Sequence, residues 1–151
     1  SLASVVMPDS ITELGTYAFR YCSGLTNLKI SAGIANISNY AFSGCDGLTN
    51  VIIPSGVLSI NYDAFLGCDN LAKVTIPKRV NYINGDAFES CKQLTTIFAV
   101  PNSYAANWAS DKGYTVEQLG DEAQIENVTF QYCILSYPQA RKASGSTVPC
   151  R

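Results

Sequence analysis

Two pairs of aspartates recur at an interval of 23 residues, which would stack their carboxylates if the chain coils with that period. Asp46 precedes Asp69, and Asp63 precedes Asp86. Stacked coils lie about 5 Å apart, a separation that suits the two carboxylates of a retaining glycosidase or part of a calcium site. Aspartate is equally favoured in polar turns, where it hydrogen-bonds the backbone. We interpret these acids first as solvated turn residues, and calcium binding and hydrolysis stay as alternatives.

The rest of the composition argues against catalysis. The chain has 151 residues and no histidine, and histidine is the commonest general base and metal ligand. The chain also lacks a Gly-x-Ser-x-Gly nucleophile motif and a glycine-rich phosphate loop. The sequence therefore predicts a protein that is not an enzyme, with no catalytic residues, no cofactor and no metal site.

The charge and hydropathy of the chain argue against nucleic-acid binding and against a membrane-spanning segment. The chain has 10 Lys and Arg against 12 Asp and Glu, a net charge of −2, whereas nucleic-acid binding calls for a clustered basic surface. No apolar run approaches the roughly 18 residues that span a bilayer. No signal peptide is visible at the first residues either. We expect no nucleic-acid partner and no transmembrane segment.

The cysteines fall into two groups. Four of them keep the interval of 23 residues, and we predict that they are free, buried thiols of the core: Cys22, Cys45, Cys68 and Cys91. Side chains in such a ladder point in parallel, so a disulfide would require the backbone to move. Cys133 and Cys150 lie outside the ladder. A disulfide between them stays an open alternative, which would stabilise the fold by about 3 kcal/mol in an oxidising compartment.

The same interval governs the apolar residues. The dipeptide Ala-Phe recurs four times, and we predict that its phenylalanines stack in the core: Phe19, Phe42, Phe65 and Phe88. A segment of the form Leu-x-x-Val-x-Ile follows each one, as at Leu48–Ile53, and indicates a short strand with three inward residues. Proline ends this strand in several repeats. The Ala-Phe-x-x-Cys stretch is too short for an α-helix and predicts a 3₁₀ turn.

The repeating unit Leu-x-x-Val-x-Ile-Pro-x-x-Val-x-x-Ile-x-x-x-Ala-Phe-x-x-Cys-x-x resembles the BspA-type leucine-rich repeat over about residues 1–119. The resemblance implies a leucine-rich-repeat solenoid of the α/β class, β-rich with short 3₁₀ turns. About five 23-residue repeats would form a right-handed coil with a helical C-terminal cap. It also implies a secreted or cell-surface protein with a part in adhesion and host interaction.

The repeat ends near residue 100, and the pattern that follows is typical of a cap. Ser103 is a favourable N-cap, and apolar residues follow it at helical spacing: Tyr104, Ala105, Trp108 and Ala109. Gly113 would stop that helix, and Trp108 would pack rather than bind a ligand. The chain thus divides into leucine-rich repeats over 1–100 (the first one partial), the cap over 101–119, and a strand plus polar tail of unknown role over 120–151.

The outward positions of the strands are the candidate binding residues. They alternate with the inward residues along the strands. Three of them are apolar, which an inert face does not need. The full set is Val6, Asn27, Lys29, Asn50, Ile52, Lys73, Thr75 and Phe98. Function in solenoids concentrates on such a shared face. We therefore expect a non-catalytic protein-interaction or adhesion module, extracellular or at the cell surface, with a host or extracellular protein as partner. A carbohydrate-binding or spacer module attached to an enzyme domain is the alternative, with a glycan as ligand.

Overall fold

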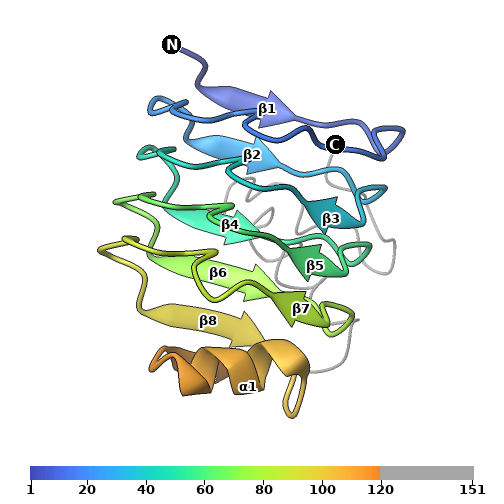
Figure 1. Cartoon of the computed structure of the whole chain (residues 1–151), viewed down its shortest axis with the longest axis vertical. Coiled ribbons are helices and arrows are strands. Elements are labelled where there is room, and N and C mark those ends of the chain that lie inside the picture. The colour runs from blue at the N-terminus through green and yellow to red at the C-terminus, as the bar shows by residue number, and fades with distance from the viewer. Residues whose placement is uncertain (120–151) are drawn as a thin grey trace, which may run out of the picture. The chain divides into compact units, whose positions relative to one another are not determined.

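The computed structural model describes residues 1–119, and these build a parallel β-solenoid of about five turns (Figure 1). Each coil is one repeat and stacks on the next. The elements are β1 (Ser4–Val6), β2 (Asn27–Lys29), β3 (Asn36–Ile37), β4 (Asn50–Ile52), β5 (Ser59–Ile60), β6 (Lys73–Ile76), β7 (Tyr82–Ile83), β8 (Thr96–Ala99), α1 (Tyr104–Asp111) and β9 (Thr115–Gln118). The predicted leucine-rich-repeat fold is confirmed.

The strand register places equivalent residues of successive repeats next to one another, in columns. Within each sheet of the repeats, strands one repeat apart pair in parallel, as Asn50 does with Lys73 and Lys73 with Thr96. One row of strands forms the sheets β1-β2 and β4-β6-β8-β9, and a second row forms the sheet β3-β5-β7. Residues 23 apart therefore lie side by side, so that a column in the sequence is also a column in space.

The phenylalanines form a continuous stack through the core. The ring centroids of Phe42 and Phe65 are 5.2 Å apart, and those of Phe65 and Phe88 are also 5.2 Å apart. Phe19 lies 5.5 Å from Phe42 at the end of the stack. Phe42 and Phe65 are fully buried, whereas Phe19 is half-buried. The stack thus joins four successive coils.

The segment around Ala-Phe differs in detail from the predicted 3₁₀ turn. Alternate backbone N–H groups bond within the coil, as Arg20 N does to Tyr17 O, while those between them bond to the next coil, as Phe19 N does to Ala41 O. This alternation requires left-handed backbone at two columns, seen in the first repeat at Tyr17 (φ 64°) and Tyr21 (φ 60°). Hydrogen bonding between coils therefore replaces the continuous i→i+3 pattern of a 3₁₀ helix.

The ladder cysteines are free thiols. The Sγ atoms of Cys45, Cys68 and Cys91 each donate to the carbonyl of the phenylalanine one repeat before, and for Cys68 the distance from Sγ to Phe42 O is 3.2 Å. Burial raises the pKa of the Cys45 thiol to about 12. The pKa of Cys68 is also raised, by a hydrogen bond with Cys91 and by burial. Cys45 and Cys68 therefore stay protonated at neutral pH and serve as hydrogen-bonding core residues.

Helix α1 and strand β9 cover the last coil. The Ser103 side chain caps the helix by accepting from Ala106 N at 3.2 Å, and Gly113 ends it with a φ of 83°. Trp108 packs between Phe88 and Tyr114, with ring centroids 5.9 and 5.7 Å away. The buried face of the helix differs from the expected one. Ala106 is buried on it with Ala105 and Ala109, while Tyr104 is 42% exposed.

Within residues 1–119, no helix is both long and apolar enough to cross a membrane. The expected strand and tail over 120–151, and the alternative disulfide between Cys133 and Cys150, lie outside the described residues.

Candidate binding surfaces

One column of polar side chains runs along the outward face of the first row of strands. Asn27 follows Ser4 in register, and Asn50, Lys73 and Thr96 follow one another in the neighbouring sheet. Asn27, Asn50 and Lys73 are exposed. Hydrogen-bonding groups therefore recur once per coil along this face.

A second outward column carries the apolar candidates. Val6 is 64% exposed and pairs with the exposed Lys29, while Ile52 and Phe98 are half-buried. Thr75 departs from the expectation, because only 4% of its surface is exposed. It lies in register between Ile52 and Phe98, which are both larger, and so it offers almost no surface to a partner.

The two columns meet at β6 and β8. The Lys73 ammonium lies 5.9 Å from the centroid of the Phe98 ring, a cation–π distance. We name the exposed and half-exposed candidate residues of both columns the outer strip: Val6, Asn27, Lys29, Asn50, Ile52, Lys73 and Phe98. The outer strip combines apolar side chains with hydrogen-bonding and basic ones.

The aspartate columns are not the uniform solvated turns that we expected. Asp63 is only 6% exposed, whereas Asp86 is exposed. Burial, with contacts to Tyr62 and Asp63, raises the pKa of the Tyr40 hydroxyl to about 12. Asp63 and Asp86 therefore have different surroundings, unlike a matched catalytic pair. Within residues 1–119, no three His, Cys, Asp or Glu side chains cluster as a metal site would require.

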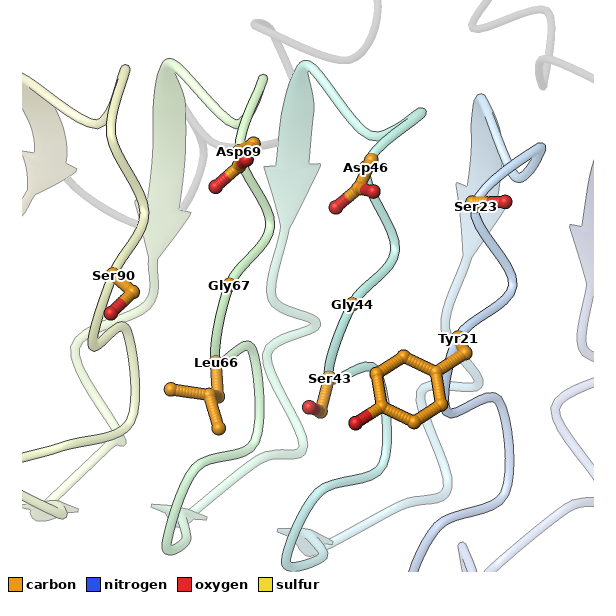
Figure 2. A pocket seen from close by; sticks show the side chains of 9 residues that line it. All are labelled: Tyr21, Ser23, Ser43, Gly44, Asp46, Leu66, Gly67, Asp69 and Ser90. Atoms are coloured by element: carbon orange, nitrogen blue, oxygen red, sulfur yellow. The ribbon is translucent and has the colours of Figure 1, made fainter.

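Asp46 and Asp69 line an open groove that crosses the coils (Figure 2). Its volume is about 610 Å³. The lining residues come from four successive repeats: Tyr21, Ser23, Ser43, Gly44, Asp46, Leu66, Gly67, Asp69 and Ser90. Lys92 lies at the next place in the aspartate column, with its Nζ 2.7 Å from Asp69 Oδ2, and this contact raises the pKa of Lys92.

The groove was not predicted from the sequence, although one signal points to it. Gly44 and Gly67 share a column with Tyr21 and Ser90, and all four have left-handed backbone. The two glycines place no side chains of their own on the floor of the groove, so the main chain is open at Gly67, whereas the Tyr21 ring packs against Gly44. Tyrosine and serine at the same column close the ends.

An aromatic cluster lies beside the groove. The rings of Tyr17 and Tyr40 stack at 5.0 Å, and the edge of Tyr62 meets Tyr40 at 5.5 Å. The Arg20 guanidinium lies 4.5 Å from the Tyr21 ring centroid and 5.1 Å from that of Tyr17. Tyr17 and Tyr21 are 51% and 67% exposed, so the cluster presents aromatic surface next to the groove.

Comparison with solved structures finds proteins of the same architecture. A leucine-rich cell surface protein from Faecalibacterium prausnitzii A2-165 is 36% identical, covering 78% of this chain and 30% of its own, with a TM-score of 0.67. A leucine-rich repeat protein from Bacteroides ovatus ATCC 8483 is 33% identical, covering 66% of this chain and 26% of its own, with a TM-score of 0.61. The present chain therefore spans less than a third of the length of either.

A leucine-rich repeat protein of T. pallidum shares the fold at 19% identity, covering 85% of this chain and 69% of its own, with a TM-score of 0.63. No curated protein matches the chain. The model of the BspA-type leucine-rich repeat region matches residues 1–106 in six copies. With the 23-residue register and the stacked phenylalanines, this match shows that the chain belongs to the BspA-type leucine-rich repeat family.

Proposed function

We propose that this protein is a non-catalytic interaction module that binds a host or other extracellular protein through the outer strip. The observation that carries the proposal is the apolar column on the sheet face. Val6 is 64% exposed, and Ile52 and Phe98 share its column in later coils. Rigid parallel strands hold these side chains in fixed positions, which lowers the entropic cost of binding.

The composition of the outer strip supports a protein partner. Interfaces combine apolar and aromatic anchors with a surrounding polar rim. Ile52 and Phe98 would supply the anchors, and Asn50 and Lys73 from the adjacent column would supply the rim. A location at the cell surface or in the extracellular space is part of the proposal. The F. prausnitzii relative, described as a cell surface protein, supports it.

The test is binding to a panel of purified extracellular-matrix proteins, immobilised for interferometry with albumin as the control. We expect at least one protein of the panel to bind. Ile52→Ser and Phe98→Ser should each weaken that binding about tenfold, as expected when an interface anchor is lost. Tyr104→Ser is the matched control, because it removes an exposed aromatic ring from helix α1 outside the outer strip. Equal affinity of all variants, or no binding to any protein of the panel, contradicts the proposal.

A carbohydrate-binding or spacer role within a longer protein is the second candidate function. The groove of Figure 2 favours the carbohydrate alternative, because it offers polar side chains and open backbone on a face distinct from the outer strip.

A further inference from the structure

We propose that the groove lined by Tyr21, Ser43, Asp46 and Asp69 binds a neutral polysaccharide laid across the coils. This site is separate from the outer strip and does not depend on a protein partner there. The proposal rests on the charge of the groove, on its open floor, on a buried hydroxyl that faces it and on an exposed aromatic ring at its end.

The charge of the groove disfavours acidic ligands. Asp46 and Asp69 lie on one rim, and Figure 2 shows their carboxylates pointing the same way. No lysine or arginine is among the lining residues, and the nearby Lys92 is already bound to Asp69. Arg20 is engaged by the Tyr21 hydroxyl and ring. Asp46 is therefore the uncompensated charge of the groove, and it would repel a phosphorylated, sulfated or carboxylated ligand.

The Asp46 carboxylate is free to accept hydrogen bonds. It has no hydrogen-bond or ion-pair partner within residues 1–119. A carboxylate has about four lone-pair positions, so it can accept from two neighbouring hydroxyls of one sugar ring. Such charge-assisted hydrogen bonds are stronger than neutral ones.

Ser43 is a second, independent indication of a ligand. The residue is 2% exposed, and it lines the groove. Its hydroxyl has no hydrogen-bond partner among the described residues. Every side-chain polar atom of these residues that is sealed from solvent does have a partner. The hydroxyl therefore keeps contact with the groove, and Figure 2 shows it directed toward the coil of Leu66. Buried hydroxyls without a protein partner are normally satisfied by water or ligand.

The floor and one end of the groove suit a sugar chain. Gly67 exposes backbone on the floor, since a Cβ there would meet nothing within 4 Å, while the Tyr21 ring packs against Gly44. Tyr21 is 67% exposed at the end of the groove. The Arg20 guanidinium also lies 4.5 Å from the ring centroid, so the ring surface that stays exposed is what a pyranose can contact. Aspartate occupies the same position in two successive coils, so successive sugars of a linear polymer can meet Asp46 and then Asp69.

A protein ligand fits this groove less well. Protein interfaces are anchored by apolar side chains in desolvated pockets, whereas this groove is open and carries only Leu66 and the Tyr21 ring as large apolar groups. A basic peptide that uses the two carboxylates is the rival occupant, and the experiment separates it from a polysaccharide.

The test is native affinity electrophoresis of the whole chain in gels that contain hydroxyethylcellulose, xyloglucan, galactomannan or glycogen. We expect at least one of these neutral polymers to retard the protein. Asp46→Asn and Tyr21→Gly should each raise the dissociation constant for the polymer, obtained from the retardation, about tenfold. This is the effect expected when a charge-assisted hydrogen bond or an aromatic contact surface is lost. Tyr21→Gly should fold, because glycine already occupies this column at Gly44 and Gly67.

The matched controls are Asp86→Asn and Tyr104→Ala, which remove an exposed carboxylate and an exposed ring outside the groove. They should be retarded like the unmodified protein. Dextran sulfate should not retard the protein at all. Three results each overturn the proposal: no retardation by any neutral polymer, retardation of Asp46→Asn and Tyr21→Gly equal to that of the unmodified protein, or binding of hexalysine that Asp46→Asn abolishes while no polymer retards the chain.

The outcome is distinguishable from that of the proposed protein-binding function. Ile52→Ser and Phe98→Ser alter the outer strip and should leave polysaccharide retardation unchanged. The groove variants should likewise leave protein binding unchanged.

Discussion

The stacked phenylalanines permit a quantitative prediction about what stabilises the solenoid. Phe65 is fully buried and lies between Phe42 and Phe88, with both ring centroids at 5.2 Å. Truncation of a buried phenylalanine to alanine costs about 3–5 kcal/mol, through lost apolar burial and the cavity left behind. Since small domains are stable by only about 5–15 kcal/mol, Phe65→Ala should remove a large part of the free energy of unfolding.

Two further variants divide that cost into its parts. Phe65→Leu keeps most of the buried volume but loses two aromatic contacts, each worth about 0.5–1.5 kcal/mol, so a cost of about 1–3 kcal/mol is expected. Phe19 is half-buried and stacks on Phe42 alone among the phenylalanines. Because it loses less buried area and one contact, Phe19→Ala should cost only about 1–2 kcal/mol.

The assay is urea unfolding at equilibrium, followed by far-UV circular dichroism and by the fluorescence of Trp108. Trp108 is the single tryptophan and contacts Phe88 at 5.9 Å, so its emission reports on the capped end. Both signals are needed, because repeat arrays can unfold in parts. A loss below about 1 kcal/mol for Phe65→Ala, or equal costs at Phe65 and Phe19, would refute the central role of the stack.

Three other features lead to predictions. Burial raises the pKa of Cys45 from the ordinary value of 9.0 to about 12, so the folded state holds this proton more tightly than the unfolded state. The free energy of unfolding, measured by urea titration, should therefore fall as the pH rises from 9 to 12. A stability that is constant from pH 9 to 12 contradicts this. Ser103→Ala removes the N-cap of α1 and should cost about 1 kcal/mol in the same assay, whereas Ser103→Asp should restore most of it. Gly67→Ala should cost about 1–2 kcal/mol, because its φ of 66° is left-handed. Gly44→Ala should cost more, since its Cβ would lie 2.4 Å from Tyr21 Cδ1, and the excess should disappear in a Tyr21→Gly background.

Much of the fold was predictable because, in a parallel solenoid, residues one sequence repeat apart are neighbours in space. Once residues 23 apart lie side by side, a repeated phenylalanine or cysteine must form a column, whatever the detail of the turns. The helix after Ser103 was predictable for a local reason, because capping and helical spacing are read from adjacent residues. The turns around Tyr17 and Tyr21 were not, because their hydrogen bonds alternate between one coil and the next.

The candidate surfaces were predictable only in part. The sequence placed the outer strip on alternate strand positions, but it could not foresee that larger neighbours on both sides would bury Thr75. It paired Asp63 with Asp86 by spacing alone, yet Asp63 is buried and Asp86 is exposed. Exposure depends on which side chains surround a position, and a residue's own type does not contain that information.

By itself, then, the sequence determined the register of the coils, the residues of the core and the cap, because each follows from period or from local chemistry. Only the tertiary structure decided where the surface is open. The groove exists because Gly44 and Gly67 carry no side chains between the flanking side chains of neighbouring coils. Its walls come from four repeats, and their spacing is set by coil stacking, so no single stretch of sequence describes it.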